Sequence, residues 1–427
     1  MSSTALRRVG VALTAATMSV AAMAGTSPAA SAKAAEPWWF SALRLSDAHQ
    51  KTTGEGVTVA VIDTAVDTKV PDLEGADIEF GAACEPNDTR SKPRIGDPVA
   101  NHGTAMSTII VGQGRGNGLD EAGITGAAPG ATVRFYNDEP DPRQTDQDCD
   151  EADTVTLFDR AISDGVDIIN YSATSSFGLE GVIRQAVDAG IVVVASAGKP
   201  GEGISSPASI PGVVAVYAVD KNARPWKGNP HMEPTNSAES WKFGFPVVSA
   251  PGVDFPAGAM DKNGTWTSGY SRTGTSDATA LVSGLLALLK SAHPKATGNQ
   301  LIQHLIHHTS DEKLDWNVRY GFGIASITEM LRHDPTTWPD VNPLLKGPEQ
   351  AMADFPAAGE GGQTPAPEPD RSPASAASDS DEGGGTPSWL WPTAIIGALA
   401  IIAVPMIARR RTTESDTTRR TAEEAGS

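Results

Sequence analysis

The chain has 427 residues, with 33 basic and 52 acidic side chains and a formal net charge of −19. This excess of negative charge repels the phosphate backbone of nucleic acids and favours solubility. We therefore expect no nucleic-acid partner.

The first 32 residues have the pattern of a secretory signal peptide. Arg7 and Arg8 precede an apolar stretch at residues 9–24, and small residues at 30–32 form a cleavage site. Residues 33–53 are too few for an independent core. We expect Trp38-Trp39-Phe40, in this N-terminal arm, to pack on the domain that follows.

An apolar run from Val57 to Asp63 predicts a strand buried on both faces. An acid at the carboxyl end of a parallel strand lies where open α/β sheets place their chemistry. Asp67 and Asp72 are alternative acids nearby, but only Asp63 ends the run.

His102 begins a helix of small and apolar residues that continues through Val111. The chain has eight histidines, and three of the others, His304, His307 and His308, are expected on an amphipathic surface helix.

Cys84 and Cys149 are the two cysteines. In an exported protein an even pair predicts a disulfide, and two free thiols are the alternative.

Ser276 lies between a Gly-Thr turn and a helix that is apolar on nearly every face. Such a helix is buried, which holds the serine rigidly. The unpaired N–H groups and positive dipole at a helix N-terminus would stabilise negative charge on a carbonyl that the serine attacks. A plain N-cap is the alternative for this residue.

Acyl transfer by a serine requires an imidazole as base and a carboxylate that orients it. The chain order Asp63, His102, Ser276 resembles the subtilisin-like serine proteases over about residues 54–332. His102-Gly103-Thr104 matches a motif of that family, and five further segments stand in the family's order. They are residues 126–131, 168–172, 195–198, 206–213 and 249–252. The resemblance implies a three-layer α/β domain with a mostly parallel central sheet, over residues 54–345.

The resemblance also implies the roles of other site residues. The Ser276 backbone N–H would bind the oxyanion, and Ser172, Ala173, Thr174, Ala197 and Gly198 would bind substrate. Lys199 stands where the family has an oxyanion-binding asparagine. Loss of that donor in subtilisin lowers turnover by roughly 10²–10³. We therefore expect a protease with reduced activity.

Acidic residues crowd the segment 138–153, which follows an expected strand at 131–136. In the resembling family this position borders the substrate cleft, and a solvated loop is the alternative. The spacing matches no calcium loop, so we expect no metal or cofactor, although a structural calcium ion stays open.

The C-terminal part predicts a membrane anchor. Residues 346–388 are rich in Pro, Gly and Ser and should form a disordered linker. Residues 389–408 carry no charge and are long enough to span a bilayer, and Arg409-Arg410-Arg411 follows, which predicts a cytoplasmic tail at 409–427. The basic residues argue against a lipid-anchor signal. With the short arm, these features resemble the mycosins, membrane-anchored subtilases associated with type VII secretion.

The sequence therefore predicts an extracellular, membrane-anchored serine endopeptidase. Its partners would be polypeptide substrates, the membrane and type VII secretion components. A non-catalytic scaffold that stabilises a secretion complex is the alternative. A tethered scavenging protease without a secretion partner is a third reading.

Overall fold

The computed structural model describes residues 36–83, 91–116, 122–139, 151–175, 178–201, 203–230, 244–310 and 316–347. The chain divides into two compact units, Met1–Gly362 and Gln363–Ser427, and all described residues belong to the first. The expected signal peptide, both cysteines, the membrane helix, the tail and nearly all of the linker lie outside the described residues. Within those ranges, no helix is both long and apolar enough to cross a membrane.

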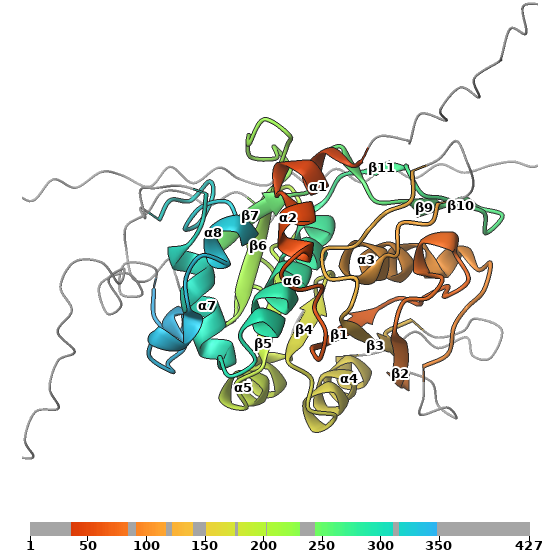
Figure 1. The fold of residues 1–427 in the computed structure, drawn as a ribbon. Helices are drawn as coiled ribbons and strands as arrows, with labels where there is room; N and C mark the ends of the chain where they lie inside the picture. The colour runs from red at the N-terminus through yellow and green to blue at the C-terminus, as the bar shows by residue number, and fades with distance from the viewer. Residues whose placement is uncertain are drawn as a thin grey trace, which may run out of the picture. The chain divides into compact units, whose positions relative to one another are not determined.

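A parallel sheet with the strand order β2-β3-β1-β4-β5-β6-β7 forms the centre of the fold (Figure 1). Neighbouring strands run parallel throughout. The strands are β1 Thr58–Asp63, β2 Ile78–Ala83, β3 Thr132–Asn137, β4 Ile168–Tyr171, β5 Val192–Ser196, β6 Val214–Val219 and β7 Val248–Pro251. Every residue of β5 and β6 is buried, so the sheet must be covered on both faces.

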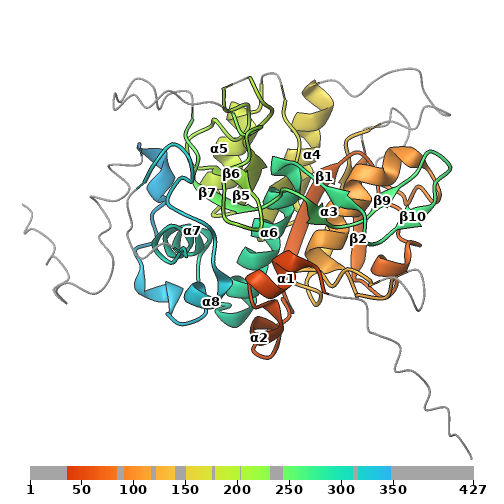
Figure 2. The ribbon, with the colours of Figure 1, turned by 90° about the horizontal axis from the view of Figure 1, so that it is seen from above.

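Helices supply that cover and complete three layers, as expected (Figure 2). On one face α3 (Asn101–Val111) packs against α6 (Thr275–Ala292), and α6 crosses β4, β5, β6 and β7. On the other face α4 (Glu151–Ser163) packs against α5 (Glu180–Asp188). The other helices are α1 Trp38–Ala42, α2 Leu45–His49, α7 Gly298–His307 and α8 Ile327–Met330, with 3₁₀ turns at Pro71–Leu73, Pro98–Ala100, Pro335–Thr337 and Pro343–Leu345.

The strand order reverses at β1, which pairs with β3 on one side and with β4 on the other. At such a reversal the connections leave a crevice at the carboxyl ends of the strands, where open α/β sheets bind ligands. Asp63 is the last residue of β1. The topology therefore places its carboxylate at the crevice.

The N-terminal arm packs on a pair of two-residue strands beside the sheet, β8 (Phe255–Pro256) and β11 (Ser271–Arg272). Trp39 is fully buried, and its ring stacks on that of Phe255 with centroids 4.9 Å apart. The indole N–H groups of Trp38 and Trp39 donate to the carbonyls of Asp254 and Pro256, each at 2.8 Å. A second short pair, β9 (Ala259–Met260) and β10 (Trp266–Thr267), lies between β8 and β11 in sequence.

The expectation of a surface helix for His304 and His307 is wrong, because these side chains of α7 are 0% and 6% exposed. The segment after Pro335–Thr337 covers them. Trp338 stacks on His307 at 4.4 Å and donates its indole N–H to Nδ1 of His304 at 3.0 Å. Since Nδ1 accepts this bond, Nε2 of His304 carries the proton that it donates to the Met330 carbonyl, 2.8 Å away.

We predict that these buried rings make the fold acid-sensitive. Burial lowers the pKa of His304 to about 3 and that of His307 to about 4, with repulsion from His308 adding to both shifts. In the unfolded chain the same rings bind protons near pH 6.5. The free energy of unfolding should therefore fall as the pH drops below about 6.5, by about 1.4 kcal/mol per pH unit for each ring that only the unfolded chain protonates.

Urea unfolding between pH 7.5 and pH 4.5 measures this slope. His304→Gln should reduce the slope, and Lys221→Gln, at an exposed residue that does not act on His304, is the control. An equal slope in the His304→Gln variant and the unchanged protein would contradict the assignment.

Candidate active site

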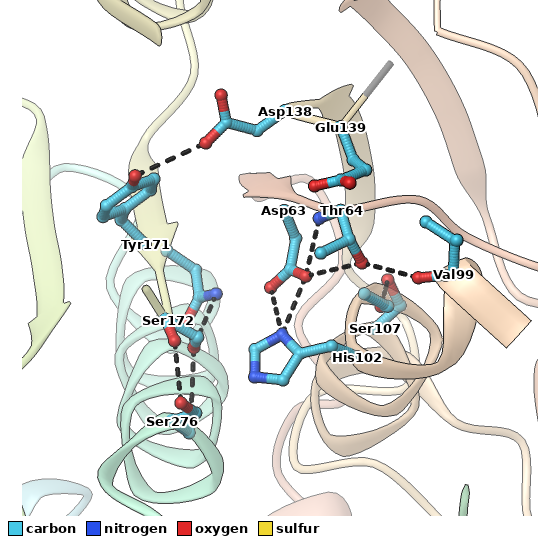
Figure 3. Close-up of polar contacts among 12 residues, drawn as sticks. Asp63, Thr64, Val99, His102, Ser107, Asp138, Glu139, Tyr171, Ser172 and Ser276 are labelled. Carbon is cyan, nitrogen blue, oxygen red and sulfur yellow. Dashed lines mark hydrogen bonds and ion pairs between the residues drawn. The ribbon is translucent and has the colours of Figure 1, made fainter. Parts of the chain in front are cut away.

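The Asp63 carboxylate is held by an imidazole and by the N–H of Thr64, and the Thr64 hydroxyl lies 3.3 Å from Oδ1. Its side chain is 1% exposed. The backbone N–H of Thr64 donates to Oδ1 at 2.8 Å, and Nδ1 of His102 lies 2.8 and 2.9 Å from the two carboxylate oxygens (Figure 3). The sequence-predicted acid and base therefore meet.

The two alternative acids hold loops instead. Asp67 accepts the N–H groups of Lys69 and Gly96, both at 2.7 Å. Asp72 is fully buried and accepts the N–H of Ile124 and the indole N–H of Trp266, both at 2.8 Å. Their hydrogen bonds explain these acids without a catalytic role.

His102 reaches Asp63 because α3 approaches the chain after β1 very closely. A Cβ atom on Gly103 would lie 2.2 Å from the carbonyl oxygen of Ala65, a distance that no side chain tolerates. Glycine directly after the histidine is therefore a packing requirement of this site. About a third of the His102 side chain, 32%, stays exposed, so the imidazole is open to a reactant.

The charge of Asp63 controls the protonation of His102. Burial alone would lower the pKa of the imidazole, but attraction to Asp63 and the hydrogen bond to it outweigh burial, so the pKa of His102 is raised above 6.5. A base with a raised pKa accepts a proton more readily once it is neutral.

Ser276 is the second residue of α6 and is half-buried. Its hydroxyl donates to the carbonyl of Ser172 at 2.7 Å, and the Ser172 hydroxyl donates to the carbonyl of Ser276 at 3.0 Å. Among the described residues, Ser276 makes no hydrogen bond to His102, although the second ring nitrogen of His102 is on the side of Ser276 (Figure 3). The hydroxyl therefore has to turn from Ser172 toward the imidazole before it can react.

Sequence reasoning missed Asn170 as a supporting residue. Its side-chain amide donates to the Ser172 hydroxyl at 3.2 Å and accepts from the Ser283 hydroxyl at 3.0 Å. Asn170 is fully buried in β4. A polar residue inside the apolar run 168–171 was the available signal, because a buried amide needs partners.

The other sequence-predicted site residues follow the ends of β4 and β5. Ser172 is buried, whereas Ala173 and Thr174 are partly exposed. After β5, Ala197 is buried and Gly198 has a φ of +117°, which favours glycine. The Gly198 carbonyl accepts the hydroxyl of Thr275, the residue before the nucleophile, at 3.1 Å.

Lys199, the next residue, has an exposed side chain and no hydrogen-bond partner in the described part of the chain. The structure thus ties the end of β5 to α6 but leaves the lysine unfixed.

The start of the acidic segment lies beside Asp63. Asp138 donates its N–H to the Asp63 carbonyl at 2.7 Å, and its carboxylate accepts the hydroxyls of Thr154 at 2.9 Å and Tyr171 at 3.4 Å. Burial, with repulsion from Asp63, raises the pKa of Asp138 to about 6. Residues 140–150 lie outside the described residues, so the path of the rest of this segment is left as a prediction.

An imidazole oriented by a buried carboxylate, beside a serine at a helix N-terminus, defines a serine hydrolase of the Asp-His-Ser order. The subtilase family model, Peptidase S8, matches residues 54–323. The chain belongs to this family.

Curated relatives share this part of the chain. A thermostable alkaline protease of Halalkalibacterium halodurans is 32% identical over 63% of this chain and 66% of its own length. Subtilisin NAT of Bacillus subtilis subsp. natto is 30% identical over 68% of this chain and 70% of its own length.

Solved structures share the fold. The prenylagaramide maturation protease PagA has a TM-score of 0.52 at 25% identity, over 68% of this chain and 97% of its own. MycP1 with its N-terminal propeptide removed has a TM-score of 0.54 at 22% identity, over 72% of this chain and all of its own. At 22% identity the likeness to MycP1 concerns the fold.

We predict that Asp63 sets the pH dependence of hydrolysis. Only neutral His102 can accept a proton, so kcat/KM should rise as the pH passes the pKa of His102. This pKa lies above 6.5 because Asp63 raises it. Asp63→Asn removes the attraction, should shift this limb to lower pH, and should reduce kcat/KM by roughly 10³–10⁴ through loss of the correct tautomer. The matched control is Asp67→Asn, and a limb unmoved by Asp63→Asn would refute the assignment.

Proposed function

We propose that this protein is a serine endopeptidase that cleaves polypeptides through an acyl-enzyme on Ser276. The observation that carries the proposal is the 2.8 Å contact between Asp63 and Nδ1 of His102, at the crevice where α6 presents Ser276. The non-catalytic scaffold is not favoured, because a chain that only stabilised a complex would not need an oriented, partly exposed imidazole.

The residues act in a fixed order. Nδ1 of His102 donates to Asp63, so Nε2 is the basic nitrogen. The Ser276 hydroxyl turns from Ser172 to Nε2 and gives up its proton as its oxygen bonds to the scissile carbonyl carbon. His102 then passes this proton to the leaving amine, and a water molecule repeats the cycle to release the acid.

Negative charge on the carbonyl oxygen needs donors that are fixed in advance. The Ser276 backbone N–H, at the start of α6, is one donor. Lys199 occupies the sequence position of the second, but an exposed ammonium on a flexible stem has no fixed aim. We infer that the oxyanion site is incomplete.

We predict that Lys199→Asn raises turnover of a peptide amide by roughly 10-fold or more, within the range of one oxyanion donor. Steady-state kinetics against the unchanged protein measure the effect, and Lys221→Asn, at another exposed lysine, is the control. A fall in turnover instead would identify Lys199 as a donor in its own right.

We also propose that the enzyme works outside the cell, tethered by residues 389–408, stabilised by a Cys84–Cys149 disulfide and associated with a secretion system. The signal-like N-terminus, the uncharged C-terminal stretch and its basic flank support the tether. The fold shared with MycP1 from the ESX-1 type VII secretion system supports the association. Co-purification with membrane secretion components tests that association, and its absence would favour a scavenging protease.

A membrane-impermeant fluorophosphonate probe tests reaction and location together. We predict labelling of intact cells at Ser276, and none in the Ser276→Ala variant. Labelling only after lysis would show that the active enzyme lies inside the cell and would contradict the proposed location. Absence of labelling both in intact cells and after lysis would favour the non-catalytic scaffold.

A further inference from the structure

A buried ion pair joins Arg272, which precedes Ser276 in the chain, to Asp277, which follows it. Nε of Arg272 donates to Oδ1 of Asp277 at 2.8 Å. The Arg272 side chain is 15% exposed and that of Asp277 is 2% exposed. Arg272 ends β11 and Asp277 directly follows Ser276 in α6, so the pair closes the corner that presents the serine.

Other hydrogen bonds also hold the turn between Arg272 and Asp277. The N–H of Gly274 donates to the Gly252 carbonyl at 2.8 Å. On the other side of the short ladder, Arg272 pairs with Phe255, the residue on which Trp39 stacks. The strand that pairs with β11 is thus packed against the N-terminal arm.

Burial of two charges is rarely favourable in itself, because the desolvation penalty offsets most of the attraction. Apolar residues of the same size would give similar stability, so stability alone does not explain a pair here. Asp277 also lies in the first turn of α6, where the helix dipole favours a negative charge. What the pair adds is a directional bond from β11 to the residue beside Ser276.

We propose that Arg272 and Asp277 form a positioning pair for the triad, which fixes the corner carrying Ser276 and keeps two opposite charges together beside His102. The proposal rests on the function proposed above and adds residues that the triad does not contain.

The charged side chains that act on His102 come from three elements. They are Asp63 from β1, Arg272 from β11 and Asp277 from α6. Arg272 lowers the pKa of His102 and Asp277 raises it, after the larger effects of burial and of Asp63. As long as the pair is intact, its two influences oppose each other. Loss of one partner should leave the other acting alone.

Two single variants separate geometry from charge. Asp277→Asn keeps an oxygen that can accept from Arg272 but removes the negative charge. It should keep plateau kcat within a few-fold and shift the acid limb of kcat/KM to lower pH. Arg272→Gln breaks the bond and leaves Asp277 alone, so the limb should shift to higher pH. Displacement of the serine should also lower kcat by roughly 10–100-fold, since a displacement of about 1 Å has an effect of that order.

Arg272→Lys restores the charge without the planar guanidinium, and should return the limb toward its original pH while kcat stays low. The control is Arg332→Gln, in the exposed Arg332–Glu329 pair next to α8, which should change neither quantity. Shifts of the limb in the same direction for Asp277→Asn and Arg272→Gln, or no shift in either, would overturn the proposal.

A second readout does not depend on activity. Titration of His102 by NMR in protein labelled with ¹⁵N-histidine should show the same opposite shifts in the two variants. If the unchanged protein hydrolyses nothing but these shifts are present, the proposed function fails and the pair stands. If the protein is active but His102 titrates identically in both variants, the pair is only structural. Should Arg272→Gln fail to fold, the shift in Asp277→Asn decides by itself, and an unmoved His102 overturns the proposal.

Discussion

The bond between the Asp63 carboxylate and Nδ1 of His102 is the interaction on which the rest of the site depends. A carboxylate at 1% exposure needs partners to stay charged, and it has the imidazole and the Thr64 N–H. Thr64 directly follows β1, but His102 has to be brought to the end of β1 by α3. The close approach of α3, permitted by glycine at 103, follows from this requirement.

Ser276, the proposed nucleophile, comes from a different part of the molecule. α6 packs against five strands of the sheet, β1 and β4 to β7, and most of its residues are buried. Its first turn is joined to the end of β4 through Ser172 and to the end of β5 through Thr275. In this resting arrangement the serine hydroxyl is occupied by a main-chain carbonyl. For reaction that hydroxyl has to leave the Ser172 carbonyl and turn toward His102.

Local patterns were sufficient to place Asp63 at the end of a buried strand and His102 at the start of a helix, whereas the parallel sheet was predicted from the family resemblance. Apolar runs identify buried strands, and an acid that ends such a run lies at the functional edge of the sheet. Contacts between distant segments carry no such signal. The burial of His304 depends on Trp338, and periodicity within one helix does not show what covers it. The Arg272–Asp277 bond likewise depends on the turn between β11 and α6, and the charges alone would equally suit a solvated surface.

Departures from the family pattern are harder to interpret than matches. Lys199, which follows β5, is exposed and has no hydrogen-bond partner among the described residues, so its role in the oxyanion site stays a prediction. Asn170 and Ser172 do support the site, although neither is proposed to react. Their hydrogen bonds link the end of β4 to α6, the helix that carries Ser276. A sequence motif names the reacting groups, whereas the groups that hold them appear only in the structure.

The tautomer of resting His102 shows whether Asp63 orients the imidazole. If Asp63 orients the imidazole, ¹⁵N chemical shifts of the resting protein well above neutral pH should show the proton on Nδ1 and a bare Nε2. The proton on Nε2 instead would leave Ser276 without a base and would contradict the account.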